Sequence, residues 1–398
     1  MSVAKRIIQI DVDKMCEGDS FYYDCLYDYL LERLGGSGAN VVYVQVFSED
    51  LSKIAEDKDR MADYLLFDPG HSLQANVINK DIFKTAVKMI REILPESRIL
   101  VWTPSIYNAF LMPGNTIIEA TQKGVQENNM WYRRASLFSE LTHTRLADFF
   151  EALGQSSEEL DGVMYQDDLM MSNWEDVSKQ GIEQLVARYG LTDTDDASLS
   201  EFLNNDESTQ NQDWRRYKTQ LLDDLSREMF EAFRRGYQQA FPDRFAQREQ
   251  QESTRLIVAR DYYDAAVLYR DGATGEWNSQ NLDTALDIYD HVVIMSYYHM
   301  STGGEPNSDG AFAWLKNLVE TAIAIANSNG RQRSDRLIFK LQSECWNYFP
   351  DNEGECGGYL VPAEILQRQA KALIEAGATG IGFYPAPVEV SHFDMSTL

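Results

Sequence analysis

The sequence has no run of about 18 apolar residues, which is roughly the shortest length that lets a helix cross a membrane, so we expect no membrane span. It also lacks the apolar core of a signal peptide, because the first residues, Met1 to Arg6, lead directly into a short strand-like run. These two absences predict a chain that is cytoplasmic as written, or the trimmed form of an exported protein.

Motifs of several enzyme classes are missing as well. No G-x-G-x-x-G follows a strand, and neither G-x-x-x-x-G-K-S/T nor G-x-S-x-G occurs, so dinucleotide, nucleoside triphosphate and serine-hydrolase sites lack their basic parts. The five histidines form no H-x-x-x-H or H-x-x-E-H pattern, and the four cysteines match no zinc spacing. We therefore expect no metal and no cofactor.

Cysteine is scarce, and its four residues fall into two locally close pairs, Cys16 with Cys25 and Cys345 with Cys356. Two small-loop disulfides are expected in an oxidising compartment, whereas free thiols are expected in a reducing one. The sequence leaves both alternatives open.

Basic residues are few relative to acidic ones. The chain has 36 Lys and Arg against 63 Asp and Glu, a formal net charge of -27 and a pI near 4.5. Such a surface repels phosphate backbones, so we do not expect nucleic acid as a partner. The simplest interpretation of the charge is a solvated acidic surface, and the alternative is the attraction of a cationic ligand.

What the sequence does contain is an alternation of strand-like and helix-like segments, which is typical of a parallel sheet wound with helices. The strand candidates are Ile7–Asp13, Asn40–Phe47, Arg98–Pro104, Gly162–Asp168, Arg255–Asp261, His291–Tyr297, Arg336–Glu344 and Gly380–Tyr384. The amphipathic helix candidates are Ser20–Leu34, Asp81–Ile93, Leu137–Leu153, Asp213–Phe241, Ala311–Asn327 and Pro362–Ala376. This pattern predicts an α/β fold, a (β/α)8 barrel formed by a single domain over residues 1–398. A polar insertion at about residues 190–213 follows the fourth strand.

Polar side chains recur on one face of several predicted strands. These faces carry Gln9, Asp11 and Asp13 on the first strand, Tyr43, Gln45 and Phe47 on the second, and Lys340, Gln342 and Glu344 on the seventh. A sheet buried on both faces would instead read as continuous apolar runs. Because the outer faces of barrel strands pack against helices, these polar faces predict a functional lumen near the carboxyl ends of the strands, where barrel enzymes place their sites.

Two adjacent carboxylates, Asp167 and Asp168, end the fourth predicted strand. Glycoside hydrolysis uses one carboxylic acid to protonate the leaving oxygen and a second group to stabilise or attack the oxocarbenium-like centre. Adjacent carboxylates disfavour double ionisation, which can raise one pKa to a value useful for an acid. Since alternation places Gln166 and Asp168 on one face, we expect Asp168 to be the acid and Asp167 to modulate it or orient the substrate. The alternative is that both Asp residues cap the next helix.

Further polar and aromatic side chains lie at or beyond the ends of predicted strands. We expect substrate contacts from Asp11, Asp13, Gln45, Phe47, His71, Trp102, Gln166, Arg260, Asp261, Tyr297, Gln342, Glu344, Trp346 and Tyr384. Flat rings bind the apolar faces of sugars, with polar groups at the rim of the cleft. Core packing explains most single rings of this kind, and it is their shared position that favours a groove.

The segments that carry this pattern resemble a known family. They run from Ile8 to Asp13, Val42 to Phe47, Asp161 to Asp168, Trp174 to Asp176 and Gly380 to Pro385. In this order and spacing the chain resembles, almost from end to end, the C-terminal glycoside hydrolase domain of bacterial proteins that deacetylate and cleave poly-β-1,6-N-acetyl-D-glucosamine, a biofilm exopolysaccharide. The resemblance implies an electronegative groove, endo-cleavage of the partly deacetylated polymer, an essential Asp in the element that matches Gln166-Asp167-Asp168, and a periplasmic or extracellular location.

The substrate implied by the resemblance fits the charge of the chain. Partial deacetylation leaves free amines, so the polymer is cationic and is attracted by cleft carboxylates. An acetamide beside the scissile bond is a candidate internal nucleophile, which predicts retention of configuration. Two positions depart from the family: Gln166 stands where the family has His, and Asp261 where Asn is expected. The alternatives are hydrolysis of another amino-sugar or extracellular polysaccharide, and a barrel that binds the polymer without cutting it. We expect a monomer.

Overall fold

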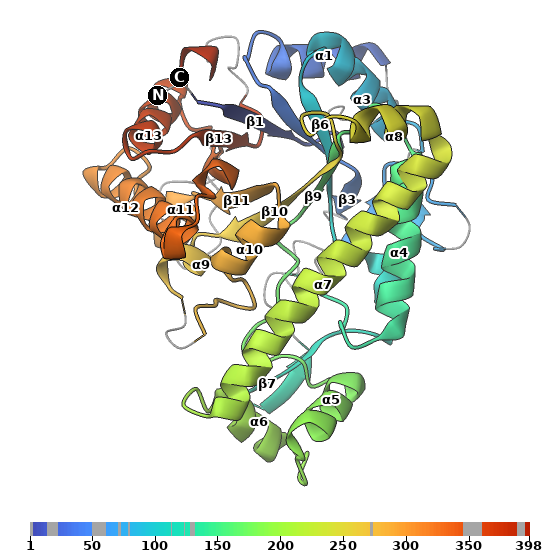
Figure 1. Ribbon diagram of the computed structural model, residues 1–398, viewed down its shortest axis with the longest axis vertical. Coiled ribbons are helices and arrows are strands. Elements are labelled where there is room, and N and C mark those ends of the chain that lie inside the picture. Colours follow the sequence, from blue (N-terminus) through green and yellow to red (C-terminus); the bar gives the residue numbers. More distant parts are fainter. Residues whose placement is uncertain are drawn as a thin grey trace.

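Eight parallel strands close into a barrel in the order β1-β13-β12-β11-β10-β9-β6-β2 (Figure 1). The computed structural model describes residues 3–13, 23–49, 61–70, 73–78, 80–112, 114–122, 124–127, 132–270, 274–344, 360–387 and 395–398. The barrel strands are β1 Lys5–Ile10, β2 Val41–Gln45, β6 Arg98–Thr103, β9 Gly162–Tyr165, β10 Ile257–Tyr263, β11 His291–Met295, β12 Leu337–Gln342 and β13 Gly380–Tyr384. Each coincides with one of the predicted strands, so the (β/α)8 barrel is confirmed.

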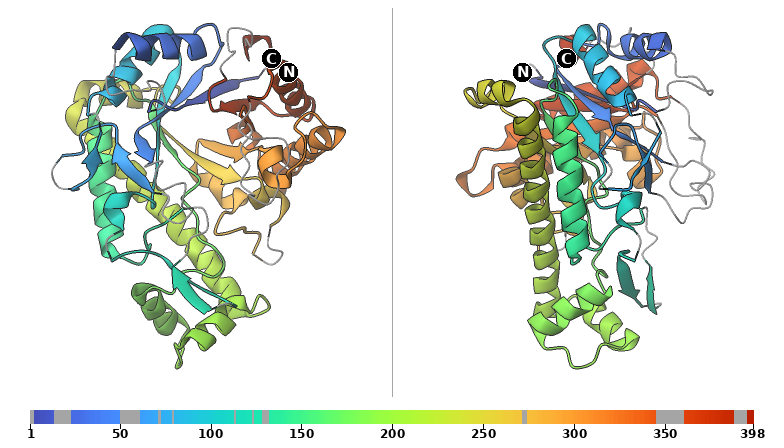
Figure 2. Two further views of the ribbon diagram at one scale, coloured as in Figure 1. Left: turned by 180° about the vertical axis from the view of Figure 1, so that it is seen from behind. Right: turned by 90° about the vertical axis from the view of Figure 1, so that its right-hand side faces the viewer.

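Helices connect the strands and cover the outer face of the barrel (Figures 1 and 2). They are α1 Tyr23–Leu34, α3 Ile82–Ile93, α4 Glu140–Gln155, α5 Lys179–Tyr189, α6 Asp196–Asn204, α7 Thr209–Ala240, α8 Pro242–Glu249, α9 Ala265–Leu268, α10 Leu282–Ile288, α11 Tyr298–Thr302, α12 Asp309–Ala326 and α13 Ala363–Glu375. The six predicted helices correspond to α1, α3, α4, α7, α12 and α13. None of the helices in these ranges is both long and apolar enough to cross a membrane. Cys25 in α1 is disulfide-bonded.

Short strands extend the barrel on the side of β2 and β6. A three-stranded sheet contains β3 Phe47–Glu49, β4 Ala62–Leu65 and β5 Asn76–Val77, and a hairpin contains β7 Ile118–Thr121 and β8 Gly124–Glu127. The β3 strand begins only two residues after β2 ends, so it lies at the carboxyl end of the barrel. This position brings it close to the candidate site described below.

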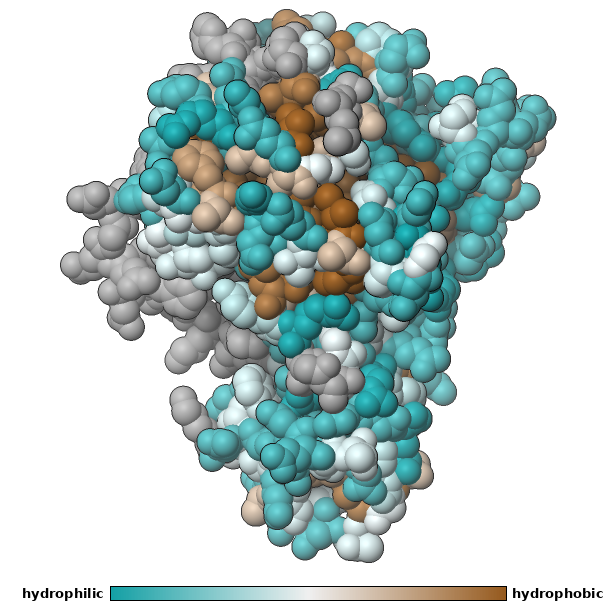
Figure 3. Space-filling model, turned by 60° about the vertical axis from the view of Figure 1, so that its left-hand side comes forward, coloured by the Kyte–Doolittle hydropathy of each residue, from teal (hydrophilic) through white to brown (hydrophobic). Residues whose placement is uncertain are grey.

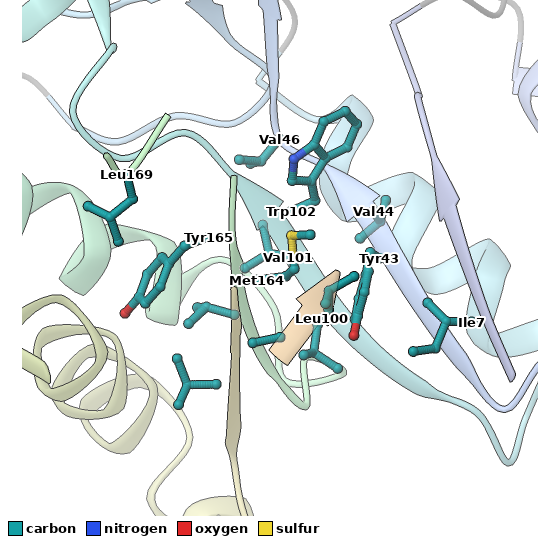
Figure 4. Packing of buried hydrophobic residues seen from close by; sticks show 14 of the residues in the cluster. Ile7, Tyr43, Val44, Val46, Leu100, Val101, Trp102, Met164, Tyr165 and Leu169 are labelled. Carbon is teal, nitrogen blue, oxygen red and sulfur yellow. The ribbon is translucent and has the colours of Figure 1, made fainter. Parts of the chain in front are cut away.

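Apolar side chains pack on both faces of the barrel sheet. Tyr43, Leu100 and Met164 come from β2, β6 and β9 and lie side by side in Figure 4. Tyr165, the next residue along β9, points to the opposite face and donates a hydrogen bond to the Ser226 carbonyl of α7 at 2.8 Å. This alternation, with successive side chains on opposite faces, fixes which residues enter the lumen.

The predicted polar insertion at residues 190–213 contains α6 and the first turn of α7. Together with α5 and the β7–β8 hairpin it forms an extension away from the barrel (Figures 1 and 2). A small separate core holds this extension together and consists of Ala120, Val177, Leu185, Leu199, Leu203 and Trp214. Its surface is mainly hydrophilic (Figure 3), which is why the sequence shows a polar stretch where the chain forms helices.

Two glycines let α4 and α7 pack closely, and both views in Figure 2 show these helices side by side. A Cβ atom at Gly154 would lie 2.1 Å from the Phe233 carbonyl oxygen, and one at Gly236 would lie 1.9 Å from the Glu151 carbonyl oxygen. Both obstacles are backbone atoms, so a side chain at either position forces the two helices apart.

We therefore expect Gly154→Ala to lower the free energy of unfolding by about 1–3 kcal/mol, the usual effect of overpacking. This loss of stability should appear even though alanine is more favourable than glycine in a helix by about 1 kcal/mol. Chemical denaturation measures it, with Gln238→Ala on the exposed face of α7 as the control, which should change stability by less than about 0.5 kcal/mol. Equal stability of the two variants would contradict the close packing.

Candidate active site

The candidate site lies where β6, β9 and β10 end at the carboxyl end of the barrel. The β9 strand ends at Tyr165, and the chain then turns, since the Gln166 N–H donates to the Thr103 carbonyl at 3.1 Å and the Met170 N–H to the Asp168 carbonyl at 2.8 Å. The strand is thus shorter than predicted. The alternation used to orient the two Asp side chains therefore stops before it reaches them.

Asp168 is completely buried. Its Oδ2 accepts hydrogen bonds from three consecutive backbone N–H groups, those of Ser105 at 3.0 Å, Ile106 at 2.6 Å and Tyr107 at 3.1 Å. Burial and, to a smaller extent, the charge of Asp167 raise the pKa of Asp168, the three N–H groups oppose the shift, and the net result is a pKa of about 8. The carboxyl group of Asp168, which we expected to be the acid, fixes the loop that follows β6.

Asp167 is the member of the pair that reaches the surface, with 9% of its area exposed. Two tyrosine hydroxyl groups donate to its carboxylate, Tyr263 at 2.5 Å and Tyr132 at 3.2 Å. Tyr263 is the last residue of β10, and Tyr132 precedes α4. Neither was predicted. The position of Tyr263, two residues after Asp261 on the same strand face, could have indicated it, whereas Tyr132 lies in a segment without periodicity.

Glu49 is a carboxylate that the sequence did not indicate and that is linked to the residue before Asp167. The Tyr107 hydroxyl lies 3.0 Å from Glu49 Oε1 and 3.3 Å from Gln166 Oε1, so one tyrosine links the short β3 strand to the element that carries Asp167. Glu49 lies outside the eight barrel strands, at the end of β3, which follows β2 at the carboxyl end of the barrel. Gln166, for which a substrate contact was expected, is thus linked through Tyr107 to Glu49.

A row of aromatic rings crosses the carboxyl end of the barrel. Ring centroids are 4.8 Å apart for Tyr132 and Tyr107, 6.0 Å for Tyr107 and Phe47, 5.2 Å for Phe47 and Trp102, and 5.1 Å for Trp102 and Tyr384. Phe47 and Trp102 are nearly buried and make edge contacts, whereas Tyr384 is half-buried. Tyr384 is therefore the most exposed ring of this row.

The lumen below this row is polar. Lys340 Nζ donates to Asp261 Oδ1 at 2.7 Å and Oδ2 at 2.6 Å, and to Gln9 Oε1 at 2.7 Å. Further towards the carboxyl end, Tyr384 donates to Asp11 Oδ1 at 3.2 Å. The polar faces predicted for the first and seventh strands thus do meet inside the barrel.

Apart from Arg260, the remaining predicted residues fall into three groups. Gln45, Tyr297 and Gln342 are buried near the carboxyl end of the lumen, and the Gln45 side chain accepts a hydrogen bond from the Val12 N–H at 2.9 Å. Asp13 and Glu344 are half-buried in segments beyond β1 and β12. His71 and Trp346 lie outside the described residues.

Arg260 is not in the groove. It is fully buried on the outer side of β10, because it alternates with the lumen residue Asp261. Its guanidinium donates to the Tyr289 hydroxyl at 3.0 Å and to the Leu169 carbonyl, and it lies 3.7 Å from Asp223. Its position behind the sheet corrects the prediction of a substrate contact. Arg260 instead holds the segment just after the Asp pair.

A buried ionic network holds the rest of that segment. Arg134 Nη2 lies 2.7 Å from Glu175 Oε1, and the same guanidinium donates to the Met170 carbonyl. Lys218 of α7 donates to the carbonyl groups of Ser172 and Glu175, the latter at 2.7 Å. The segment before α4 and helix α7 are thereby tied to the loop that begins at Asp167.

A second charged cluster lies far from the Asp pair, at the other end of the barrel. A cavity of about 360 Å³ lies at the opposite, amino-terminal end of the strands, where Asp161 pairs with Arg248 at 2.5 Å and Arg91 at 3.0 Å. Its charged groups largely neutralise one another and close the barrel. Across the described ranges, no group of three His, Cys, Asp or Glu residues is arranged to hold a metal ion.

The fold is shared with solved glycosidases. The glycoside hydrolase domain of PgaB (BpsB) from Bordetella bronchiseptica matches with a TM-score of 0.74 and 23% identity, covering 99% of this chain and 97% of that one. A β-galactosidase from Rahnella sp. R3 matches with a TM-score of 0.56 and 12% identity, covering 96% of this chain and 50% of that one. At these identities the likeness establishes the fold.

Sequence comparison gives the family. Poly-beta-1,6-N-acetyl-D-glucosamine N-deacetylase of Escherichia coli (strain K12) is 23% identical over 384 residues, which is 96% of this chain but only 50% of that protein. A family model described as hypothetical glycosyl hydrolase family 13 matches residues 9–384. The resemblance predicted from the sequence is thus confirmed, and the chain belongs to the hypothetical glycosyl hydrolase family 13.

Proposed function

We propose that this chain is a glycoside hydrolase that cuts within partly deacetylated poly-β-1,6-N-acetyl-D-glucosamine, with Asp167 as the proton donor. The observation that carries the proposal is the position of Asp167. It reaches the surface at the carboxyl end of a closed barrel, where barrel enzymes place their reactive groups, and two tyrosine hydroxyls hold its carboxyl group in place.

In the proposed reaction the Asp167 carboxyl group donates its proton to the glycosidic oxygen as the bond from that oxygen to the anomeric carbon breaks. Water then adds its oxygen to the anomeric carbon and returns a proton to the site. The positive charge that develops on the sugar is stabilised by a second group, for which the acetamide of the substrate and the carboxylate of Glu49 are the candidates. Participation of the acetamide requires retention of configuration, which NMR of the first product reveals.

The substrate proposal rests on charge and on the relatives. Free amines make the partly deacetylated polymer cationic, and a chain with a net charge of -27 attracts it over distances of about 10 Å at moderate salt. A relative that spans twice the length of this chain is named for action on the same polymer. A polymer that is secreted places the reaction in the periplasm or outside the cell.

One observation favours the alternative of a barrel that binds polymer without cutting it. Gln166, beside Asp167, accepts or donates hydrogen bonds but carries no proton that titrates near neutral pH. A reaction that needs a titrating group at this position would fail here, whereas binding would not.

Incubation with partly deacetylated polymer, followed by mass spectrometry of the soluble products, tests the proposal. We expect oligosaccharides from this polymer, fewer from its fully acetylated form, and a rate that falls as salt screens the attraction. Binding to the polymer without oligosaccharides would support the binding barrel. Cleavage of only a different amino-sugar polymer would support a glycoside hydrolase but would contradict the proposed substrate.

A further inference from the structure

The cavity at the amino-terminal end of the barrel has the size of a small-ligand site. Its volume is about 360 Å³, and pockets that hold small molecules span about 300–1,000 Å³. The segments that line it lead into β6, β9 and β10 or belong to α3 and α8. Four of the lining residues are arginines, namely Arg91, Arg98, Arg244 and Arg248. This concentration of guanidinium groups contrasts with the net charge of -27 of the whole chain.

Two of these arginines are neutralised within the lining. Asp161 Oδ1 accepts a hydrogen bond from Arg248 Nη1 at 2.5 Å, and Asp161 Oδ2 accepts one from Arg91 Nη2 at 3.0 Å. Glu159 Oε2 accepts a further hydrogen bond from Arg91 Nε at 3.0 Å. The carboxylates of Asp161 and Glu159 therefore offset the charges of Arg91 and Arg248.

The charges of the other two arginines are not offset in this way. Arg98 donates to the Arg255 carbonyl, and Arg244 Nη1 donates to Gln247 Oε1 at 3.3 Å. Neither Arg98 nor Arg244 forms an ion pair with any residue that the structure describes. Glu96, the third acidic residue of the lining, is exposed to solvent and pairs with no cation in the same ranges. Two guanidinium charges thus border the cavity without a counter-ion in contact.

Arg248 provides a second, independent observation. Its residue is only 5% exposed, its Nε donates to the Tyr237 hydroxyl at 2.9 Å, and its Nη1 donates to Asp161 and to the Thr254 carbonyl, the latter at 3.2 Å. Its Nη2 is buried and has no hydrogen-bond partner in the described part of the chain. A buried donor without an acceptor is unfavourable. Nη2 is therefore the arm of this guanidinium that remains for an acceptor supplied from the cavity.

We propose that this cavity is a binding site for a phosphate group, either as the free ion or as part of a small phosphorylated molecule. Guanidinium groups match the oxygen atoms of phosphate in geometry as well as in charge. A phosphate monoester carries about 1.5 to 2 negative charges at neutral pH, which suits the two unpaired guanidiniums of Arg98 and Arg244 better than a single carboxylate does. Its oxygens supply the acceptor for Arg248 Nη2.

The proposed site is separate from the candidate active site, so the inference goes beyond the proposed function. Arg98 begins β6, Arg248 belongs to α8, and Asp161, which Arg248 contacts, directly precedes β9. A bound phosphate therefore links α8 to the beginning of the barrel strands. Because it binds only the folded chain, it should stabilise the barrel.

Calorimetric titration of the whole chain with inorganic phosphate and with glucose 6-phosphate tests the proposal, in chloride at constant ionic strength. We expect saturable binding of one phosphate group per chain and a Tm that rises by about 3 °C at a concentration 100 times Kd. Tighter binding of glucose 6-phosphate would identify a phosphorylated molecule as the ligand. Binding of inorganic phosphate that is equally tight or tighter would identify the free ion.

Two variants link the binding to the arginines. Arg244→Gln should weaken it by about 10-fold or more, the effect of losing a charged hydrogen bond, and should leave the Tm without phosphate unchanged, because Arg244 is exposed. Arg248→Lys keeps a cation for Asp161 but removes the Nη2 arm, so it should weaken binding to a similar extent. Arg227→Gln is the matched control, since Arg227 is exposed and lies outside the lining. Its affinity should stay within about 2-fold of the wild type.

Three results would overturn the inference. The first is a wild type that shows no saturable binding of either phosphate. The second is an equal loss of affinity in Arg244→Gln and Arg227→Gln, which would reduce the effect to the overall charge of the chain. The third is full affinity in both Arg244→Gln and Arg248→Lys. If Arg248→Lys does not fold, the comparison of Arg244→Gln with Arg227→Gln decides alone.

Discussion

Asp167→Asn is expected to reduce kcat/KM for polymer cleavage by at least about 100-fold, the usual contribution of a general acid. The amide has nearly the same size as the carboxyl group and still accepts hydrogen bonds from Tyr263 and Tyr132, so the loop around it should keep its shape. What is lost is the proton for the leaving oxygen. Initial rates of oligosaccharide release, measured for both proteins at the pH optimum of the wild type, give the ratio.

Asp168→Asn is the matched control, since it makes the same chemical change one residue away. The Asn carbonyl oxygen accepts the same three backbone N–H groups, and a carboxyl group with a pKa of about 8 is already largely neutral at pH 7. Activity should therefore stay within about 10-fold of the wild type, less than the loss of a general acid. A loss in Asp168→Asn equal to that in Asp167→Asn would assign the acid role to the buried residue instead.

Asp168 also makes the stability of the folded chain depend on pH. The pKa of Asp168 in the folded chain lies above the value of about 4 in the unfolded chain. The contribution of Asp168 to the free energy of unfolding is therefore fully present below pH 4 and is lost as the pH rises through about 8. The Tm of the wild type should consequently fall over this range more than that of Asp168→Asn, which has no group to ionise.

The barrel was predictable from the sequence because its strands differ from their surroundings in composition. Runs such as Val41–Gln45 and His291–Met295 are apolar and bounded by helical patterns, and these signals are local. The same local signal placed Lys340 on the lumen face of its strand. Its partner, Asp261, could not be paired with it in advance, because the contact depends on which strands face each other across the closed barrel.

The directions in which the side chains of the site point were less predictable, for a physical reason. Alternation holds only while a strand continues, and β9 ends at Tyr165, two residues before Asp167. Once the chain turns, the direction of each side chain depends on tertiary contacts such as the backbone N–H groups that bind Asp168. Tyr132 and Glu49 reach the site from segments outside the barrel strands, and no periodic pattern indicates such residues.

Glu175→Gln is expected to lower the free energy of unfolding by about 3–5 kcal/mol, because it leaves the guanidinium of Arg134 buried without its counter-ion. The two side chains lie 2.7 Å apart and are 0% and 1% exposed, so water cannot replace the lost charge. Chemical denaturation of the variant and the wild type measures the difference. The effect should extend to activity, since Arg134 also holds the Met170 carbonyl, three residues beyond Asp167.

The exposed pair Lys316–Glu320 on α12 provides the comparison, with side chains 64% and 56% exposed. Glu320→Gln removes the same kind of charge, but solvent screens the pair, so the loss should be below about 0.5 kcal/mol. Replacing both buried partners, with Arg134→Met and Glu175→Met, should recover part of the stability, because the guanidinium is removed together with its counter-ion. It should not recover activity, because Arg134→Met removes the donor to the Met170 carbonyl. Equal losses in Glu175→Gln and Glu320→Gln would show that the buried pair does not stabilise the loop that carries Asp167.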